Sequence, residues 1–528
     1  MRRLTLALAL ALAGAAAGGT SALAAVDAPV PTTGTTPFAP NCNGAPQSGT
    51  LYRNTEPEPW IDVDPTSLAD VNGPDLIGVY QQDRFSTGGA NGLGTSVSRD
   101  GGETWTGLGV GSLPKFSRCA GAAPGTPADP DGPDNGDYER ASDPWVSFGP
   151  DGDAYQISLS FNDTRDLANA VLVSESRDGG QTWRRPQVLR RDTSPTVFND
   201  KESLTADYTN ANFVYAVWDR LVFPNERSQG RSYERAAAFR GPTWFARTHN
   251  GGTSWEPARP IFDPGQNDQT IGNQIVVMPD GDLVNGFALL QNDNKDLLKG
   301  GSVAVIRSTN RGSTWSDQII VSRLGAVGVT DPRDGEDVRT GDIIPEIASD
   351  ERGASDSKCS TGDCVYMVWQ DARFTNSQRD QIAFSKSTDG GRTWSRPVRI
   401  NKVPGTQAFT PAIRVDDHGN IGVTYYDFRN DTTASPTLDT DLWFLRSRDG
   451  GQTWSEERVT DSSFDMRTAP FARGYFVGDY QGLTAYGNEF GAYSTLTLPP
   501  FNDSQGATGL DTQNRTDVFF ARAHPPFP

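Results

Sequence analysis

Histidine and cysteine are scarce in this sequence. Of 528 residues, 3 are histidine and 4 are cysteine, and His249, His418 and His524 lie far apart along the chain. Zinc and most other transition metals are held by clusters of these two residue types. We therefore predict no such metal site and no required cofactor. The chain also lacks an EF-hand loop of the Asp-x-Asp-x-Asp-Gly kind, but its many carboxylates leave bound calcium open.

Positive charge is also in short supply. The chain has 47 Lys and Arg residues against 66 Asp and Glu residues, which gives a formal net charge of −19. A surface of this sign repels the phosphates of nucleic acids and the headgroups of anionic lipids. We therefore expect neither nucleic acid nor a membrane among the partners, and we expect a monomer.

After the first 25 residues the sequence has no long apolar run. The one such run, from Leu4 to Ala17, follows Arg2 and Arg3 and leads into small residues that end near Ala24. It is short for a helix that spans a bilayer and typical of a cleaved signal peptide. A membrane anchor is the alternative. We predict that residues 1–25 are a signal peptide and that the mature protein is secreted and extracellular.

The four cysteines suit an oxidising compartment. Cys359 and Cys364 flank four residues and could close a short loop, whereas Cys42 and Cys119 either pair with each other or stay free. We interpret them as structural.

One eight-residue pattern occurs six times. Its form is Ser/Thr-x-Asp/Asn-x-Gly-x-Thr/Ser-Trp, at Ser98 to Trp105, Ser176 to Trp183, Thr248 to Trp255, Ser308 to Trp315, Ser387 to Trp394 and Ser447 to Trp454. Asp or Asn can accept hydrogen bonds from backbone N–H groups just ahead, and Gly supplies the positive φ of a tight turn. The pattern predicts hairpin turns, each with a Trp that packs between neighbouring units.

Short strand-like runs fill the intervals between these turns, which is typical of β-propeller blades. We predict an all-β chain that folds as a single β-propeller of four-stranded antiparallel blades, with seven blades favoured over six. A Pro/Thr/Gly-rich lead segment covers residues 26–48 and the propeller covers residues 49–528. Its inner strands are expected at residues 60–64, 145–149, 203–207, 274–278, 345–350, 411–416 and 481–486. A segment near Thr50 to Asn54 could complete the last blade.

The repeated pattern resembles the Asp box, or BNR repeat, of the sialidase (neuraminidase) superfamily. Asp boxes also occur in propellers that resemble xyloglucanases, sortilin-type receptors and photosystem assembly factors, so they indicate a fold rather than an activity. In a four-stranded blade these turns point to one face, and the starts of the inner strands and the ends of the second strands point to the other. We expect the functional site over the axis on the second face.

Charged residues that do not follow the repeat are the better site candidates on that face. They are Glu56, Glu58, Glu139, Arg140, Asp143, Asp200, Lys201, Glu202, Asp342, Glu346, Asp479 and Tyr480. By contrast, Asp-Arg pairs recur at the ends of the second strands, as in Asp83-Arg84 and Asp219-Arg220, and most of them are expected to form ion pairs between blades.

The resemblance to sialidases implies specific roles. Tyr52-Arg53 is similar to the start of their Tyr/Phe-Arg-Ile-Pro motif, although Asn54 and Thr55 replace Ile-Pro. In that comparison Asp83 takes the place of the catalytic acid of sialidases. Glu202 and Tyr480 follow each other in the same order as the sialidase Glu and the Tyr nucleophile that this Glu activates. The substrate-binding candidates are Arg53, Arg140, Arg220, Arg373, Arg429 and Asp479, because an Arg fork suits a sugar carboxylate.

Two functions follow from these observations. The first is a secreted glycosidase of the exo-α-sialidase type that removes terminal acidic sugars from a glycan or glycoconjugate. The alternative is a non-catalytic extracellular propeller that binds glycan or protein. A polysaccharide lyase on the same ring is less favoured, because lyases commonly use His or Tyr as the base and His is scarce.

Overall fold

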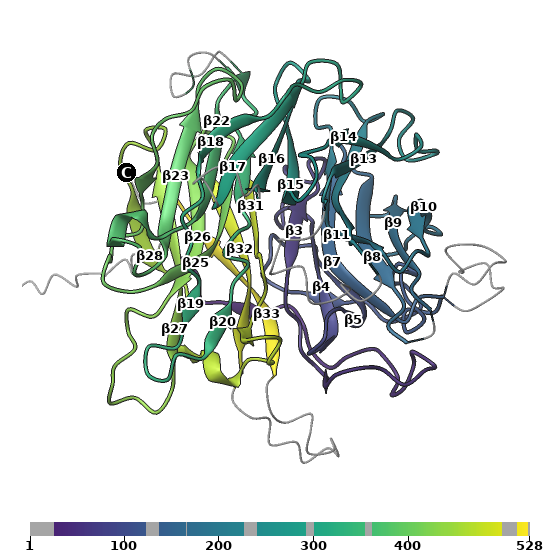
Figure 1. Cartoon of the computed structure of the whole chain (residues 1–528), viewed down its shortest axis with the longest axis horizontal. Coiled ribbons are helices and arrows are strands. Elements are labelled where there is room, and N and C mark those ends of the chain that lie inside the picture. Colours follow the sequence, from purple (N-terminus) through teal and green to yellow (C-terminus); the bar gives the residue numbers. More distant parts are fainter. Residues whose placement is uncertain are drawn as a thin grey trace, which may run out of the picture.

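The computed structural model describes residues 26–122, 137–164, 166–225, 240–291, 300–353, 359, 362–498 and 515–525. The predicted signal peptide lies outside these residues. Within them the chain is built almost wholly from antiparallel strands, and the only helices are two short 3₁₀ segments, η3 (Ala372–Thr375) and η4 (Met466–Thr468). The prediction of an all-β chain with four-stranded antiparallel sheets is confirmed, and the arrangement is consistent with a β-propeller (Figure 1).

Most strands belong to units of four neighbouring strands, each named here after its inner strand. The first units in the chain are β3 (Trp60–Val63), β4 (Leu76–Phe85), β5 (Ala90–Ser98) and β6 (Thr106–Gly107); β7 (Arg140–Phe148), β8 (Ala154–Phe161), β9 (Asn169–Ser176) and β10 (Gln187–Asp192); and β11 (Val197–Ala206), β12 (Val214–Val222), β13 (Thr243–Thr248) and β14 (Arg259–Phe262).

The later units follow the same order. They are β15 (Gln269–Val277), β16 (Leu283–Gln291), β17 (Gly300–Ser308) and β18 (Ile319–Arg323); β21 (Glu346–Ser349), β22 (Val365–Asp371), β23 (Gln381–Ser387) and β24 (Val398–Arg399); β25 (Ala408–Val415), β26 (Ile421–Asp427), β27 (Asp439–Ser447) and β28 (Ser455–Arg458); and β31 (Gly482–Tyr486), β32 (Glu489–Thr497) and β33 (Thr516–Ala523).

Several short strands lie outside this scheme. The strand β29 (Phe464–Asp465) pairs with β27, and β19 (Val329–Thr330), β20 (Asp337–Arg339) and β30 (Tyr475–Phe476) form a small sheet in which β20 and β30 run parallel. This small sheet brings a segment between the β15 and β21 units against the segment that leads into β31.

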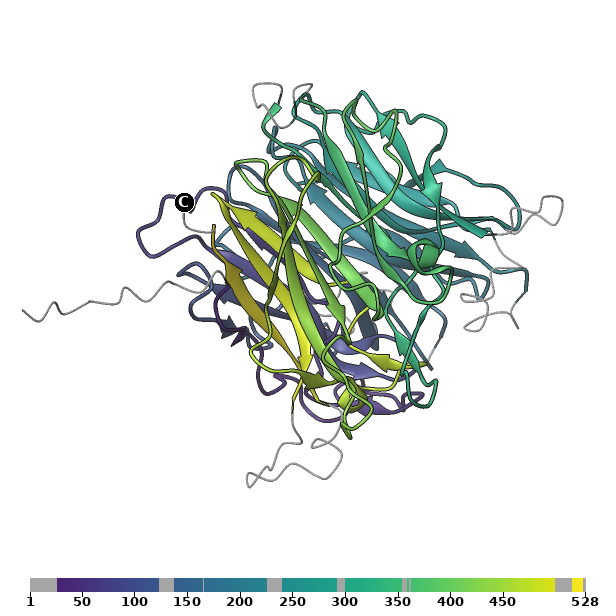
Figure 2. The same cartoon turned by 90° about the vertical axis from the view of Figure 1, so that its left-hand side faces the viewer.

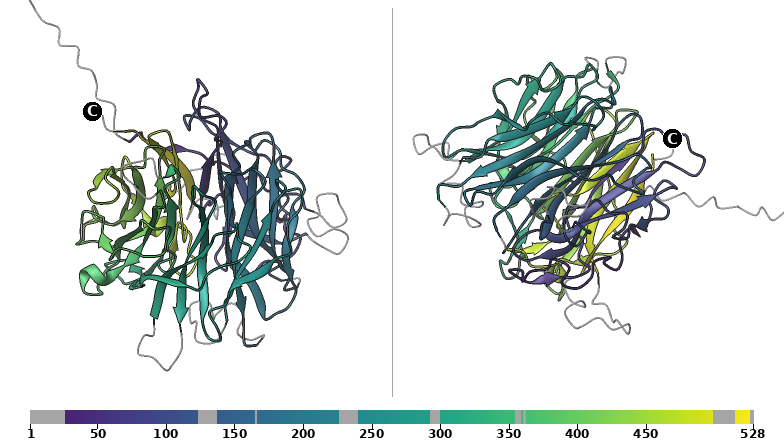
Figure 3. Two further views of the ribbon diagram at one scale, coloured as in Figure 1. Left: turned by 90° about the horizontal axis from the view of Figure 1, so that it is seen from above. Right: turned by 90° about the vertical axis from the view of Figure 1, so that its right-hand side faces the viewer.

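The inner strands contact one another in the order β3, β7, β11, β15, β21, β25 and β31, and β31 in turn contacts β3. Figure 1 shows this last contact, with purple β3 and yellow β31 side by side near the middle of the molecule. Figure 2 shows the green and yellow strands of the β25 and β31 units in front. The N-terminal and C-terminal parts of the chain are neighbours in every view (Figure 3).

The outer edge of the β31 unit is covered by the N-terminal strand β1 (Val30–Pro31), in which Val30 pairs with Phe520 of β33. The expectation that a segment near Thr50 to Asn54 fills this place is wrong. That segment forms β2 (Leu51–Tyr52), which pairs instead with the end of β4. Both pairings reduce the number of unpaired edge groups.

The repeated turns make one set of hydrogen bonds. In the second copy Thr182 N donates to Asp178 Oδ1 over 2.9 Å, and Gly180 N donates to Ser176 Oγ over 2.9 Å. Where Asn replaces Asp, Ser254 N still donates to Asn250 Oδ1 over 3.0 Å. The turn therefore needs a side-chain oxygen at this position more than it needs a charge.

The Trp at the end of the repeat packs against the preceding unit, as predicted. Trp315 contacts Phe245 of the β11 unit with ring centroids 5.7 Å apart, and Trp454 contacts Phe384 of the β21 unit at 5.2 Å. These rings fill the seams between units and hold their spacing.

Both cysteine pairs form disulfides, Cys42 with Cys119 and Cys359 with Cys364. The first links the lead segment to the connection between the β3 and β7 units. No helix within the described residues is long and apolar enough to span a membrane.

Candidate active site

Four of the inner strands, β7, β11, β15 and β25, have a bulge near their starts. In β11 the pairing with β12 skips residues between Asp200 and Ser203, and Lys201 there has a φ of 50°. Glu58 and Asp143 take the same backbone conformation, with φ of 56° and 50°. Positive φ is unfavourable for residues with a Cβ atom, and it persists where the surrounding structure imposes it. The bulge turns these three charged side chains toward one place.

Lys201 lies at the centre of this group. Its Nζ is 2.8 Å from Glu58 Oε1, 2.9 Å from Asp143 Oδ1 and 2.9 Å from Asp479 Oδ2. The four residues belong to the starts of β11, β3, β7 and β31, so the cluster joins units that are distant in sequence. Lys201 is only 7% exposed, and ion pairs at such a position are stronger than surface pairs but need complete pairing. We call Glu58, Asp143, Lys201 and Asp479 the axial cluster.

Two guanidinium groups flank the axial cluster. Arg339, from β20, forms two hydrogen bonds with the carboxylate of Asp479. Arg84, from β4, donates to Gln81 Oε1 over 2.7 Å, and its Nε has no partner among the described residues. Both guanidinium groups contact the ring of Phe476, at 4.5 Å and 5.0 Å from its centroid. A place next to Asp479 is therefore rich in N–H donors.

An aromatic layer lies beneath the cluster. Trp60 and Trp145 stack with ring centroids 3.2 Å apart, and Tyr480 contacts them at 6.3 Å and 5.6 Å. The Nζ of Lys201 lies 5.2 Å from the Tyr480 ring centroid, a favourable cation–π contact. The layer closes the centre of the ring just below the charges.

Neighbouring carboxyl groups at this site differ in protonation. Burial alone would raise the pKa of Asp479, but Arg339 and Lys201 more than offset it and hold that pKa below the usual range. Burial, with repulsion from Asp143 as a further cause, raises the pKa of Asp200 to about 8. Asp200, still partly exposed, is thus protonated at neutral pH while Asp479 is ionised. Carboxyl groups with pKa values driven apart are suited to separate acid and base roles.

Glu202 and Tyr480 lie next to the cluster but do not form a hydrogen-bonded pair. Neither carboxylate oxygen of Glu202 has a partner among the described residues, and burial raises its pKa well above the usual range, with repulsion from Asp143. Burial also raises the pKa of Tyr480, whose hydroxyl donates to Pro144 O over 3.4 Å. The Tyr480 hydroxyl is therefore uncharged at neutral pH.

Asp83 lies in a separate hydrogen-bond network. Its carboxylate accepts from Asn54 N, Asn91 Nδ2 and Thr36 Oγ1, each over 2.9 Å. Its backbone has a φ of 65° within β4. Arg53 donates to Phe38 O over 3.1 Å and does not meet the axial cluster. Asp83 thus anchors the lead segment against β4.

The other candidate arginines each pair locally, and the structure does not bring them together. Arg140 pairs with Asp163, and Arg220 pairs with Asp192 of the preceding unit. Arg373 and Arg429 pair with the Asp residues two positions before them in their own Asp-x-Arg sequences. Of the substrate-binding candidates, Asp479 is the one that lies in the axial cluster.

Sequence reasoning named Glu58, Asp143, Asp200 and Lys201 among the candidates but missed Arg339. That residue belongs to a three-residue strand in a connection between units. No repeat or motif surrounds it, and only the parallel pairing of β20 with β30 carries it to Asp479. The long connection that contains Arg339 was the sequence feature that could have pointed to it, since long loops often supply site residues.

Comparisons with known proteins give a limited picture. No known family matches the sequence, and no curated protein does. Among solved structures, the Hadza microbial sialidase Hz136 is 15% identical with a TM-score of 0.43, over 73% of this chain and 66% of the other. An α-L-arabinanase of Penicillium chrysogenum is 13% identical with a TM-score of 0.40, over 72% and 92%.

A sialidase of Trypanosoma rangeli is also similar, with 12% identity and a TM-score of 0.40 over 73% of this chain and 55% of that one. This chain thus spans less than two thirds of the length of both sialidases.

Proposed function

We propose that this protein is a secreted seven-bladed β-propeller glycosidase that removes a terminal acidic sugar at the axial cluster. The observation that carries the proposal is the pair of carboxyl groups beside Lys201, in which Asp200 is protonated and Asp479 is ionised. The cyclic order of the inner strands supports the blade count.

Glycoside cleavage needs a proton for the leaving oxygen and a negative charge near the oxocarbenium-like centre. Asp200 supplies the proton, since its pKa of about 8 keeps it protonated at neutral pH. Asp479, or Asp143 beside it, supplies the charge or activates a water molecule. The strained backbone at Asp143 and Lys201 supports a functional site, because such conformations gather where function requires them.

Arg84 accounts for the preference for an acidic sugar. Its guanidinium lies on Phe476, and no ion pair of Arg84 occurs in the described part of the chain. A sugar carboxylate that binds to Arg84 would gain charge-assisted hydrogen bonds. This assignment replaces the clamp expected from Arg220, Arg373 and Arg429, which, like Arg339, are occupied by carboxylates.

The test is hydrolysis of a chromogenic sialoside by the mature chain. Asp200→Asn and Asp479→Asn are each expected to lower kcat/KM by about 10²- to 10⁴-fold, whereas Asp317→Asn, at an exposed position, leaves it unchanged. Asp83→Asn, Glu202→Gln and Tyr480→Phe test the roles implied by the resemblance to sialidases. Activity that depends on these three residues and not on Asp200 would contradict the assignment made here.

The second candidate function is a non-catalytic propeller. It is favoured by one observation, the complete pairing of Lys201 with three carboxylates in a place that is 7% exposed. A network of this kind can serve only to join units. Wild-type protein that binds sialosides but releases no sugar between pH 4 and 9, with or without calcium, would support this function over the first.

A further inference from the structure

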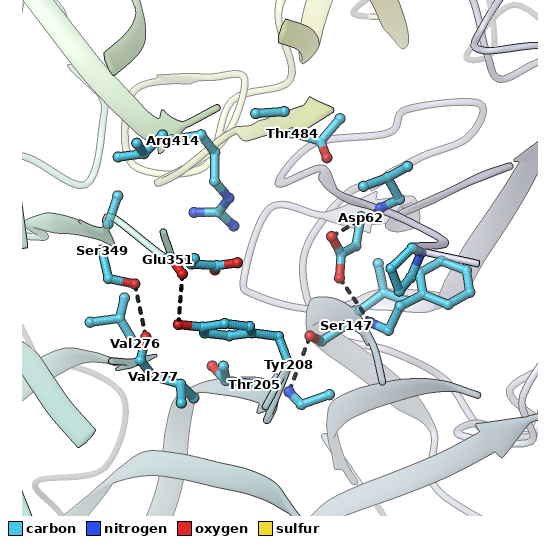
Figure 4. Close-up of a pocket in the computed structure, with 18 of the residues that line it drawn as sticks. Asp62, Ser147, Thr205, Tyr208, Val276, Val277, Ser349, Glu351, Arg414 and Thr484 are labelled. Atoms are coloured by element: carbon cyan, nitrogen blue, oxygen red, sulfur yellow. Dashed lines mark hydrogen bonds between the residues drawn. The ribbon is translucent and has the colours of Figure 1, made fainter. Parts of the chain in front are cut away.

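A second polar site lies at the other end of the inner strands. A pocket of about 240 Å³ opens there, lined by Asp62, Ser147, Thr205, Arg414 and Thr484 from the later parts of five different inner strands (Figure 4). The axial cluster lies at the starts of these strands. The pocket therefore faces the side of the repeated turns.

The aromatic layer separates the pocket from the axial cluster. Trp60 and Trp145 line the pocket on one side. Tyr480 contacts both rings, and Lys201 lies over Tyr480. A ligand in the pocket therefore cannot touch Lys201, and the two sites are distinct.

Arg414 is the only Lys or Arg among the residues that line the pocket. Its guanidinium lies 4.7 Å from the ring centroid of Trp60 and points into the middle of the space (Figure 4). It donates one hydrogen bond, to Ile413 O over 3.2 Å, and forms no ion pair within 4.0 Å in the described ranges. Since a guanidinium has five N–H donors in a planar fork, most of its donors face the pocket.

Acceptors and hydroxyl groups face Arg414 across the space. The oxygens of Asp62 accept from Val63 N over 2.9 Å and from Phe148 N over 2.8 Å, which fixes the carboxyl in place. The carboxyl of Glu351 lies beside Arg414, and the Tyr208 hydroxyl donates to Glu351 O over 3.4 Å (Figure 4). Fixed carboxyl groups of this kind accept hydrogen bonds from ligand hydroxyls.

We propose that this pocket binds a ligand of monosaccharide size that carries one carboxylate and several hydroxyl groups, of the hexuronic acid class. Arg414 holds the carboxylate through its planar fork, and Asp62 and Glu351 accept hydrogen bonds from the hydroxyls. The pocket volume of about 240 Å³ is the volume that roughly eight water molecules occupy in liquid water, at about 30 Å³ each. That space suits one sugar ring.

Three carboxyl groups line the pocket, those of Asp62, Glu351 and Asp417. Burial raises the pKa of Glu351 to about 7, with repulsion from Asp62 and Asp417 as further causes, and burial also raises the pKa of Asp62 and of Asp417. Near neutral pH Glu351 is therefore partly protonated, carries less negative charge than an ordinary carboxylate and can donate a hydrogen bond. Arg414 supplies the positive charge that a ligand carboxylate meets.

The test is a titration of the mature chain with D-glucuronate in which saturation-transfer NMR detects the binding. D-glucose serves as the uncharged comparison ligand. Wild type is expected to bind glucuronate and not glucose. Arg414→Met should weaken the binding at least about tenfold, because a bidentate charge-assisted pair is lost. Arg379→Met, at an exposed position, is the matched control and should bind like wild type.

Two further variants keep the test decisive. Arg414→Lys retains the charge but lacks the fork, so it should fold like wild type and still bind more weakly. Arg339→Met removes an arginine of the axial site and should leave pocket binding unchanged. The proposal is overturned if wild type binds no glucuronate, if glucose binds equally well, if Arg414→Met and Arg414→Lys bind like wild type, or if only Arg339→Met loses the ligand.

Discussion

Nζ of Lys201, in the β11 unit, lies 2.9 Å from Oδ2 of Asp479, which stands just before β31. Arg339 binds the same carboxylate from a third direction. One aspartate thus joins three segments that are remote in sequence. Since the contact involves charges that are almost fully buried, the stability of the whole ring depends on it.

Replacement of Lys201 by Met tests this dependence. The change leaves Glu58, Asp143 and Asp479 close together without their shared cation. Removal of one partner from a buried ion network typically costs about 3–5 kcal/mol in the free energy of unfolding. Denaturant unfolding monitored by tryptophan fluorescence measures this cost. Lys402→Met, at an exposed position, should cost almost nothing, and equal stability of the two variants would refute the role of the network.

Glu202 should make stability depend on pH. Burial raises its folded-state pKa well above the ordinary value of 4.5, so the unfolded chain releases this proton at a lower pH than the folded chain. The stabilising effect of the protonated carboxyl is full below pH 4.5 and is lost as the pH rises toward the folded pKa.

The measurement is the free energy of unfolding between pH 4 and 9 for wild type and Glu202→Gln. The amide cannot ionise. Between pH 4.5 and the folded-state pKa, the free energy of unfolding of the variant should therefore rise relative to that of wild type by up to about 1.4 kcal/mol per pH unit. Glu336→Gln, on an exposed turn, should follow wild type at every pH. Parallel curves for wild type and Glu202→Gln would show that the carboxyl is not held protonated.

The repeated turns offer a comparison already present in the chain. Asn250 makes the same backbone contact as Asp178, with distances of 3.0 Å and 2.9 Å. Asp178→Asn should therefore change the melting temperature little at pH 7. Asp178→Ala removes the acceptor for Thr182 N and should cost about 1 kcal/mol. Calorimetry on the two variants decides the point, and an equal loss for both would mean that the charge matters rather than the hydrogen bond.

The two disulfides should contribute unequally. Cys42 and Cys119 are 77 residues apart in sequence, whereas Cys359 and Cys364 are 5 apart. If cross-links act mainly by restricting the unfolded chain, the first is worth about 4 kcal/mol and the second about 2 kcal/mol. Double Cys→Ser variants of each pair, compared by denaturant unfolding, measure both. A larger loss for the Cys359–Cys364 pair would contradict this order.

Much of the fold could be predicted from local patterns. The turn pattern marks each third-to-fourth strand connection, and the expected inner strands all overlap observed ones. The starts of β3, β21 and β31 were predicted to within one residue. The other four starts were placed too late: the predicted strand at residues 203–207 begins in fact at Val197. The bulge at Lys201 interrupts the alternation of side chains there, so a pattern search stops at the bulge.

The site was less accessible to sequence reasoning, for a physical reason. Charged candidates could be chosen because they break the repeat, and Lys201, Asp143 and Glu58 do meet. Which arginine joins them depends on strand pairing between distant segments. Arg373 and Arg429 belong to a conspicuous repeat, yet each folds back onto its own Asp. Arg339 has no local sign and reaches Asp479 through the β20–β30 pairing.

The pairing of β1 with β33 also has a consequence for the order of events during synthesis. Strand β1 is made well before its partner β33, because Val30 and Phe520 are 490 residues apart in sequence. The early strand must wait without its partner while the intervening units form. Contacts of such long sequence separation slow folding. The docking of β1 onto β33 should therefore be a late step of assembly, and a chain stalled before residue 516 should lack this contact and be degraded more readily by proteases.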